Sequence, residues 1–346
     1  MISLGFLILG LNFLSYQKSE NERNNQTQTK NVFDEYCNDF NKSYHSKQEY
    51  GVRKEIFLKN LNAINKHNGN NSETYKMSIN QFTDMTFKEL YDLNYPDEGE
   101  SSSKMDTTKY TSPETENLLS DSFEENVPDS FDWRNFDVIS NIKDQKLCGS
   151  CFIYAVLEEI ESQIKIKTNQ SYEFSRQEIL DCARKGYGSL GCSGGSLYGV
   201  HSYIKNRGGI SEEKFYPYEA KENLCRSEKF PKIDIDLKGI KIFDTEDEDI
   251  LKRALYTLGP ITVIIDNLHD SFFRYSSGIY YEQECNESDA YSHAVVIIGY
   301  GSSNGKDYWT IKNSYGEKWG EKGYMRIARN QNNHCKISSF NMVTKL

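Results

Sequence analysis

The sequence predicts an α+β protein with more than one domain. Its 346 residues exceed what one small hydrophobic core organises. Apolar residues recur at helical spacing over residues 153–164, which indicates a helix, whereas residues 294–301 form a continuous apolar run typical of a buried strand. The composition, 37% hydrophobic and 13% aromatic, is sufficient for a globular fold.

The charge balance argues against a nucleic-acid-binding protein. The chain has 41 lysines and arginines against 51 acidic residues, for a net charge of −10, and it has no block of basic residues. Phosphate binding requires a basic surface, so we expect no nucleic-acid partner.

A long apolar run stands at the N-terminus, from Ile2 to Leu14. At about 13 residues it is too short to span a bilayer, which takes about 20, but it suits the apolar part of a signal peptide. A short buried strand or helix is the alternative. We therefore expect a signal peptide over residues 1–16, no membrane span, and entry into the secretory pathway. There the sequons at Asn169 and Asn286 could carry glycans.

A stripe of residues at helical spacing lies between residues 31 and 68, a segment that we expect to be helical. Its members recur every three or four residues and so share one helix face. It begins with a glutamate four residues before an arginine, the favourable order for a helical ion pair. Two asparagines on the stripe are unusual for a plain core face. The stripe consists of Glu49, Arg53, Phe57, Asn60, Ile64 and Asn68.

Two shorter segments and a polar stretch follow the stripe. Residues 75–84 alternate like a strand, and a helix is expected from Thr86 to Asn94. Residues 95–126 are rich in Ser, Thr, Asp and Glu, which predicts a flexible linker that proteases can reach. The composition changes near Val127, where we place the start of a second domain.

The cysteines are distributed unevenly around Val127. Cys37 alone precedes it, and seven follow it. An odd number in a secreted chain leaves at least one thiol without an intramolecular partner, and six cysteines allow fifteen pairings, so spacing alone assigns none of them. The seven are Cys148, Cys151, Cys182, Cys192, Cys225, Cys285 and Cys335.

Cys151 lies at the first turn of the helix expected over residues 153–166. Backbone N–H groups and the positive end of the helix dipole favour a thiolate there, which is the reactive form of cysteine. A buried or disulfide-bonded cysteine is the structural alternative. The spacing from Cys148 would also suit a zinc or redox motif, but Cys182 and Cys192 are too far apart for a second close ligand pair, and a βαβ context is missing.

Four histidines follow Val127, and one has an unusual setting. His293 opens the apolar run of residues 294–301, where a titratable side chain must be paired or functional. A core histidine with satisfied hydrogen bonds is the alternative. The other three fall in helical, turn or loop sequence and are expected to be solvated or capping residues: His201, His269 and His334.

These motifs together resemble the precursors of papain-family, cathepsin L-like cysteine proteases. The stripe reads E-x3-R-x3-F-x2-N-x3-I-x3-N, similar to the ERFNIN pattern of their inhibitory prodomains. Asn80, Phe82 and Asp84 match a second prodomain element, in which Ser78 replaces a glycine. Residues 148–152 read C-G-S-C-F, similar to the nucleophile signature of the family, although Phe152 stands where Trp or Tyr is usual.

The resemblance continues through the C-terminal half. S-H-A-V-x-x-x-G-Y-G around His293 is similar to the histidine strand of the family, and about 142 residues separate His293 from Cys151, as expected there. Asn313 ends a predicted strand before a glycine-rich turn and matches the orienting asparagine. Two residues depart: Tyr315 stands where the family usually has Trp, and Ser292 where it often has Asp or Asn.

The resemblance implies a papain-like, two-lobed α+β fold preceded by a helical inhibitory prodomain. A helical lobe of about residues 127–235 would face a β-barrel-like lobe of about residues 236–346. The prodomain, residues 31–94, would cover the cleft between the lobes until it is removed. Three disulfides that leave Cys151 free are also implied: Cys148–Cys192, Cys182–Cys225 and Cys285–Cys335.

Roles for individual side chains follow from the same resemblance. Cys151 would be the nucleophile, His293 its base, Asn313 the residue that orients the imidazole, and Gln145 the side-chain donor of the oxyanion hole. Substrate backbone and the pocket for the second residue before the cleaved bond would involve Gly194, Gly195, Leu197, Ile264, Ala294 and Phe340. None of these is acidic, so we expect an apolar residue in that pocket.

We therefore expect a cysteine-type endopeptidase made as a zymogen, with protein and peptide substrates and its own prodomain as intramolecular inhibitor. No metal or organic cofactor is implied, and we expect a monomer. Two alternatives are a homologue that keeps the fold only for binding and a Cys–His acyl transferase. The retained nucleophile, base and oxyanion donor argue against the first, and the prodomain argues against the second. A lysosome or vacuole and the extracellular space both fit a signal peptide with disulfides.

Overall fold

The computed structural model describes most of the chain between residues 32 and 346. The described ranges are 32–94, 115–117, 123–124, 126–184, 186–243, 246–285 and 292–346. The predicted signal peptide, most of the predicted linker and the sequon at Asn286 lie outside them.

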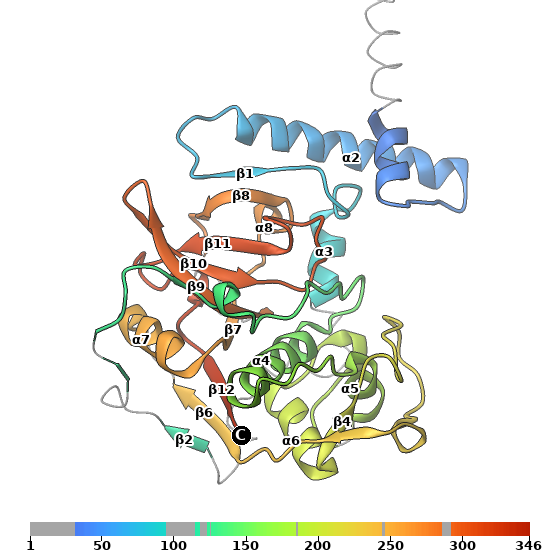
Figure 1. Cartoon of the computed structure of the whole chain (residues 1–346). Helices are drawn as coiled ribbons and strands as arrows, with labels where there is room; N and C mark the ends of the chain where they lie inside the picture. Colours follow the sequence, from blue (N-terminus) through green and yellow to red (C-terminus); the bar gives the residue numbers. More distant parts are fainter. Residues whose placement is uncertain are drawn as a thin grey trace, which may run out of the picture. The chain divides into compact units, whose positions relative to one another are not determined.

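Among the described residues, one mixed sheet gathers ten strands, most of them from the C-terminal half (Figure 1). Its strands are β1 (Tyr75–Met77), β2 (Thr115–Asn117), β3 (Phe131–Asp132), β6 (Gly239–Phe243), β7 (Ile261–Ile265), β8 (Tyr275–Tyr280), β9 (His293–Ser303), β10 (Lys306–Lys312), β11 (Tyr324–Ala328) and β12 (Asn341–Lys345). The order is β1-β8-β11-β10-β9-β7-β12-β6-β2, with β3 paired to β9. The pairs β11–β8 and β2–β6 are parallel and the others antiparallel. β9 and β10 thus lie side by side in the middle of the sheet.

Helix α4 (Cys151–Thr168) packs on this sheet. It contacts β7, β9 and β12 as well as α5 (Arg176–Cys182) and α6 (Leu197–Arg207). Because neighbours lie on several sides, residues 151–162 of α4 are all buried. The helix ends at Asn169, whose left-handed conformation (φ 59°) caps it. The helix predicted over residues 153–166 is therefore confirmed, with its first residue at Cys151.

Two further helices contact the sheet, and one separate strand pair lies near α6. α7 (Glu248–Leu258) contacts β9, and the short α8 (Asp270–Phe273) contacts β8. β4 (Gly209–Ser211) and β5 (Lys232–Asp234) form a separate antiparallel pair near the helices. No helix in the described part of the chain is long and apolar enough to cross a membrane.

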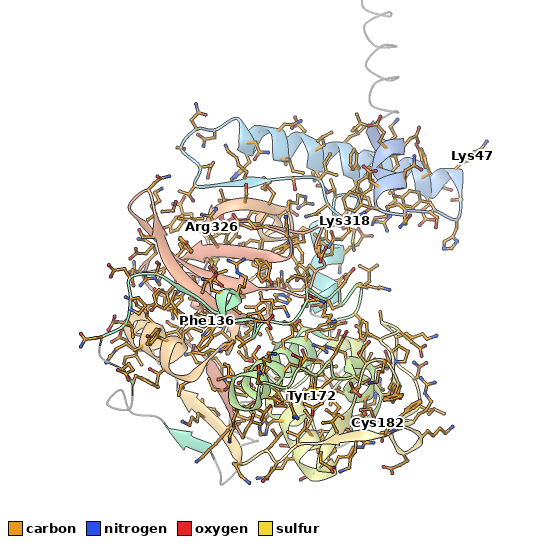
Figure 2. All side chains as sticks on the ribbon, in the orientation of Figure 1. Lys47, Phe136, Tyr172, Cys182, Lys318 and Arg326 are labelled. Atoms are coloured by element: carbon orange, nitrogen blue, oxygen red, sulfur yellow. A yellow bond between two sulfur atoms is a disulfide. The ribbon has the colours of Figure 1, made fainter. Side chains whose placement is uncertain are left out.

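One hydrophobic cluster joins α4 to the sheet, and side chains fill the space between them (Figure 2). Leu157 and Ile160 of α4 and Ile298 of β9 are fully buried within it. A buried ion pair also connects the helix to the sheet: Nζ of Lys312 lies 3.2 Å from Oε1 of Glu158. Lys312 ends β10 and Glu158 lies on α4, so the pair links the helix that begins at Cys151 to the strand that precedes Asn313.

Within the described N-terminal region, residues 32–69 and 79–86 form a compact unit of their own. Residues 70–78 and 87–94 belong instead to the unit that contains the sheet, where β1 pairs with β8. The predicted helix over residues 86–94 is present as α3 (Phe87–Asn94). The strand predicted over residues 75–84 is shorter than expected: it ends at Met77, and residues 81–84 form turns in which Oδ1 of Asn80 accepts from the N–H of Phe82 at 3.0 Å.

The helix expected from residue 31 to residue 68 is interrupted, and that expectation was wrong in this respect. Residues 32–39 are helical, and α2 (Lys47–Asn68) begins only after a break. Ser46 caps α2 by accepting from the N–H of Glu49 at 3.0 Å, and Oε2 of Glu49 accepts from the N–H of His45 at 2.7 Å. These reciprocal bonds resemble a capping box, a local signal for a helix start.

The stripe on α2 packs as its spacing predicts. Phe57, Asn60 and Ile64 are buried. Asn60 is buried because its Nδ2 donates to the carbonyls of Thr83 at 2.8 Å and Met85 at 2.9 Å. Asn60 can therefore occupy a buried position on this helix face, because it supplies hydrogen bonds to backbone carbonyls of the turn at residues 83–85.

Asp84 connects several segments of this unit through hydrogen bonds. Its carboxylate accepts from the hydroxyls of Tyr36 at 2.6 Å and Tyr44 at 2.9 Å, and from Nζ of Lys42 at 2.7 Å. Its carbonyl accepts from Nη1 of Arg53 at 3.1 Å. The two prodomain motifs of the sequence therefore meet inside one small folded unit.

Candidate active site

Cys151 is the first residue of α4. The loop before it is fixed by the Cys148–Cys192 disulfide and by the N–H of Gly149, which donates to the carbonyl of Cys192 at 2.8 Å. Burial raises the pKa of the Cys151 thiol, while hydrogen bonds from the backbone of Ala294, Phe152 and Cys151 itself act in the opposite direction. The bond from Ala294, the residue after His293, places the Cys151 sulfur at the start of β9.

His293 is the first residue of β9, where it pairs with Ile265 of β7. The imidazole is buried, and its Nε2 lies 2.8 Å from Oδ1 of Asn313. Its Nδ1 has no hydrogen-bond partner in the described part of the chain. Burial lowers the pKa of His293 to about 4, although the bond to Asn313 acts to raise it. The two shifts, on Cys151 and on His293, both favour the neutral thiol and neutral imidazole in the full-length chain.

Asn313 follows the last residue of β10, and both its backbone and its side chain form hydrogen bonds. Its N–H donates to the carbonyl of Gly323 at 3.0 Å, and its Oδ1 also accepts from the N–H of Ser314 at 2.8 Å. Because this oxygen can only accept, Nε2 of His293 must be the donor in their hydrogen bond. The neutral imidazole therefore carries its proton on Nε2 and its lone pair on Nδ1.

Gln145 lies in the loop before Cys151 and is almost fully buried. Its Oε1 accepts from the hydroxyl of Ser314 at 2.5 Å, and its backbone N–H donates to the Ser314 carbonyl at 2.8 Å. Its Nε2 donates to the carbonyl of Cys148 at 3.0 Å. The amide is thus oriented with its oxygen toward Ser314 and its nitrogen toward the loop that carries Cys151. Ser314 was missed in the sequence, although it directly follows Asn313.

The residues expected to contact substrate fall into two groups. Gly194 has a left-handed φ of 101°, and a Cβ added at Gly195 would lie 2.6 Å from the ring of Phe152. The second group, all buried in the cluster that includes Cys151, comprises Leu197, Ile264, Ala294 and Phe340. Within it, Ile264 and Ala294 are paired across β7 and β9.

Tyr315, one of the two departures from the family pattern, covers the histidine. Its ring stacks on the His293 imidazole with centroids 4.8 Å apart and planes 29° apart. The ring is buried, and Nδ2 of Asn267 donates to its hydroxyl at 3.2 Å. Asn267 was also missed in the sequence, because no local pattern distinguishes it from an ordinary turn asparagine.

The disulfides of the structure join the pairs that the resemblance implies: Cys148–Cys192, Cys182–Cys225 and Cys285–Cys335. Cys182, labelled in Figure 2, ends α5. Cys37 and Cys151 are the free cysteines. His334 lies with the sulfurs of Cys285 and Cys335 within 4.8 Å, but those sulfurs form a disulfide and are not the thiolates that bind metals.

Two of the other three histidines differ from the sequence-based expectation. His201 and His334 are buried rather than solvated, and burial lowers the pKa of each to about 4. Nε2 of His334 accepts from the N–H of Glu282 at 3.1 Å, so this histidine has a structural partner. His269 is partly buried, and nearby Asp266 raises its pKa. His269 also stands at the N-cap position of α8, as the expectation of a capping residue allows. The expectation was wrong for His201 and His334, because the burial of their side chains depends on distant segments of the chain.

Comparison with known proteins places this arrangement in a family. Residues 127–345 match the papain family cysteine proteases, and residues 33–90 match the cathepsin propeptide inhibitor domain. The chain therefore belongs to the papain family of cysteine proteases and carries the inhibitory propeptide of its cathepsin-like members.

Named relatives agree with this assignment. A cathepsin L-like peptidase of Aedes aegypti is 36% identical over 304 residues, which cover 86% of this chain and 88% of the relative. Cathepsin S of Bos taurus is 34% identical over 304 residues, covering 87% and 88%. The structure of digestive procathepsin L 3 from the larval midgut of Tenebrio molitor superimposes with a TM-score of 0.80 at 33% identity, covering 92% of this chain and 99% of that one. The chain is thus a cysteine protease that is made as a zymogen.

Proposed function

We propose that Cys151 and His293 are the nucleophile and base with which this zymogen, once activated, hydrolyses peptide bonds. The observation that carries the proposal is the hydrogen bond between Nε2 of His293 and Oδ1 of Asn313, 2.8 Å long. It directs the Nδ1 lone pair away from Asn313. The hydrogen bond from the backbone of Ala294 to the Cys151 sulfur brings the thiol to the same end of β9. Both observations support the roles of nucleophile for Cys151, base for His293 and orienting residue for Asn313.

Each step then follows from these groups. The thiol proton of Cys151 moves to Nδ1 of His293, and the sulfur attacks the peptide carbonyl carbon. The resulting oxyanion accepts from the N–H of Cys151 and from Nε2 of Gln145, a donor of the kind that contributes about 3 kcal/mol. The C–N bond breaks as His293 protonates the departing amine. Water, deprotonated by His293, attacks the thioester and regenerates the thiol.

The burial of the pair suggests how the zymogen is kept inactive. In the full-length chain burial favours the neutral thiol and imidazole. Greater access of water to Cys151 and His293 would act against both shifts, since desolvation is their largest cause. We assign inhibition to residues 31–94, cleavage to residues 95–126 and peptidase activity to residues 127–346, in lobes of about 127–235 and 236–346.

We place the protein in the secretory pathway, in a lysosome, a vacuole or the extracellular space, as a monomer. The three disulfides support an oxidising compartment. The sequon at Asn169 is exposed at the end of α4, so a glycan could be attached there. The N-terminal apolar run supports the signal peptide that this route requires.

The direct test is peptidase activity of the purified full-length chain before and after acidification in mild reductant. We expect activity to rise as a cut appears near Val127, and to disappear when iodoacetamide adds one adduct to Cys151. Mass spectrometry of the alkylated chain locates the adduct. Complete removal of the prodomain without peptidase activity, despite a reactive Cys151, would contradict the proposal and favour the binding homologue or the acyl transferase.

The proposed pocket predicts a specificity. Because Leu197, Ile264, Ala294 and Phe340 offer no charge partner, burying a guanidinium there would be costly. We expect kcat/KM for peptides with Leu at the second position before the cleaved bond to exceed that for Arg by about tenfold or more. The measurement uses two fluorogenic peptides that differ only at that position. Equal rates would show that these residues do not form the pocket.

A further inference from the structure

Two departures from the family pattern are close to His293: Ser292 precedes it in the chain, and the ring of Tyr315 stacks on its imidazole. Both contact one residue, Asn267, which is fully buried just after β7. The last residue of β7, Ile265, pairs with His293. Asn267 therefore lies two residues after Ile265, the residue that pairs with His293. It contacts both the start of β9 and the Tyr315 ring that covers His293.

The backbone of Asn267 fixes the residue before the histidine. Its N–H donates to Oγ of Ser292 at 2.9 Å, and the Ser292 hydroxyl in turn donates to the carbonyl of Ile265 at 3.2 Å. The N–H of Ser292 also donates to that carbonyl at 3.1 Å. These bonds tie the start of β9 to the end of β7, so His293 has little freedom to move along its strand.

The side chain of Asn267 fixes the ring over the histidine. Its Nδ2 donates to the Tyr315 hydroxyl at 3.2 Å, and the Tyr315 ring stacks on the imidazole of His293. The ring also contacts Phe273, 6.1 Å away and nearly parallel, and Trp319, 5.5 Å away and nearly perpendicular. The aromatic neighbours limit how the ring tilts, and the hydrogen bond holds its far end.

The two polar atoms of the Asn267 side chain differ in their contacts. Its Oδ1 is buried and has no hydrogen-bond partner in the described part of the chain. Its Nδ2 donates to the hydroxyl of Tyr315, and this hydrogen bond orients the amide toward the ring that covers His293.

We propose that Asn267 is a positioning residue for His293: its side chain acts through Tyr315, and its backbone N–H holds Ser292. This inference rests on the proposed role of His293 as the base. By holding the strand start and the covering ring together, Asn267 keeps the imidazole aligned with Asn313 on one side and Cys151 on the other. Alignment of a base with its nucleophile governs the chemical step, whereas substrate binding depends on other residues.

The test is a double-mutant cycle in the mature enzyme with Asn267→Ala, Tyr315→Phe and both together. Tyr315→Phe keeps the ring and removes only the hydroxyl. We expect each single change to lower kcat about tenfold with KM changed less than about twofold. If the side chain of Asn267 acts through that hydroxyl, the double variant should also lose about tenfold rather than about a hundredfold.

Tyr216→Phe is the matched control, because it also removes one hydroxyl from a buried tyrosine, here bonded to Asp181 at 2.6 Å. Its kcat should not change. An unchanged kcat in Asn267→Ala, losses that multiply in the double variant, or an equal loss in Tyr216→Phe would each overturn the inference. If Asn267→Ala does not fold, Asn267→Ser, which is too short to reach Tyr315, takes its place. An inactive wild-type enzyme would instead show that the proposed function has failed.

Discussion

Cys151→Ala is expected to lower kcat/KM for peptide hydrolysis by at least about 10⁴-fold, because the change removes the thiol proposed to form the acyl intermediate. The change should leave the fold intact, since alanine replaces only the sulfur of a buried side chain at the first position of α4. The measurement is hydrolysis of a fluorogenic peptide by the purified chain after acid treatment, alongside the melting temperature of both proteins.

The chain offers a matched control for this variant. Cys37 is the other free cysteine and lies outside the peptidase region. The full-length Cys37→Ala chain should therefore reach wild-type peptidase activity after acid treatment. Full-length Cys151→Ala should also remain uncut by itself but be cut near Val127 when active wild-type enzyme is added. Self-cleavage of Cys151→Ala at the wild-type rate would contradict the assignment of the nucleophile.

The elements that carry the proposed dyad could be predicted because their signals are local. Cys151 precedes an apolar helical pattern and begins α4, and His293 precedes a run of buried aliphatic residues and begins β9. Asn313 stands between a strand and a glycine-rich turn. In each case a change of pattern over a few residues marks where a strand or helix starts or ends, and that is where functional side chains are often held.

What the sequence did not predict depends on contacts between distant segments. Asn267 and Tyr315 are far apart in the chain, and the pairing of β9 with both β7 and β10 brings the asparagine to the ring. The burial of His201 and His334 has the same origin. By contrast, the start of α2 is predictable from the sequence, because Ser46 and Glu49 form a local capping signal.

The pKa of Cys151 also depends on more than its local sequence. Its position at a helix N-terminus favours the thiolate, and backbone N–H groups do act in that direction. Burial outweighs them in the full-length chain and raises the pKa of the thiol. The sign of the shift is therefore set by access of water to the site.

Phe57→Ala is expected to destabilise the unit formed by residues 32–69 and 79–86 by about 3–5 kcal/mol, the usual cost of removing a buried phenylalanine. Phe57 is fully buried, with ring centroids 4.7 Å from Tyr36 and 5.2 Å from Phe33. A unit of this size has little stability in reserve. We expect it to unfold at a lower temperature and to stop inhibiting, so that the full-length chain becomes active at neutral pH without acid treatment.

Unfolding is measured with Phe57→Ala in the Cys151→Ala background, where self-cleavage cannot obscure the transition. Activation is measured separately with Phe57→Ala in a chain that keeps Cys151. Val52→Ala is the control on the same helix: Val52 is 51% exposed, so its loss should change stability by less than about 0.5 kcal/mol. If Phe57→Ala lowers the melting temperature but the chain stays inactive at neutral pH, inhibition does not depend on the folded state of this unit. If neither changes, the aromatic cluster does not hold the unit together. Only the joint change, lower stability with earlier activity, connects the buried face of α2 to control of the protease.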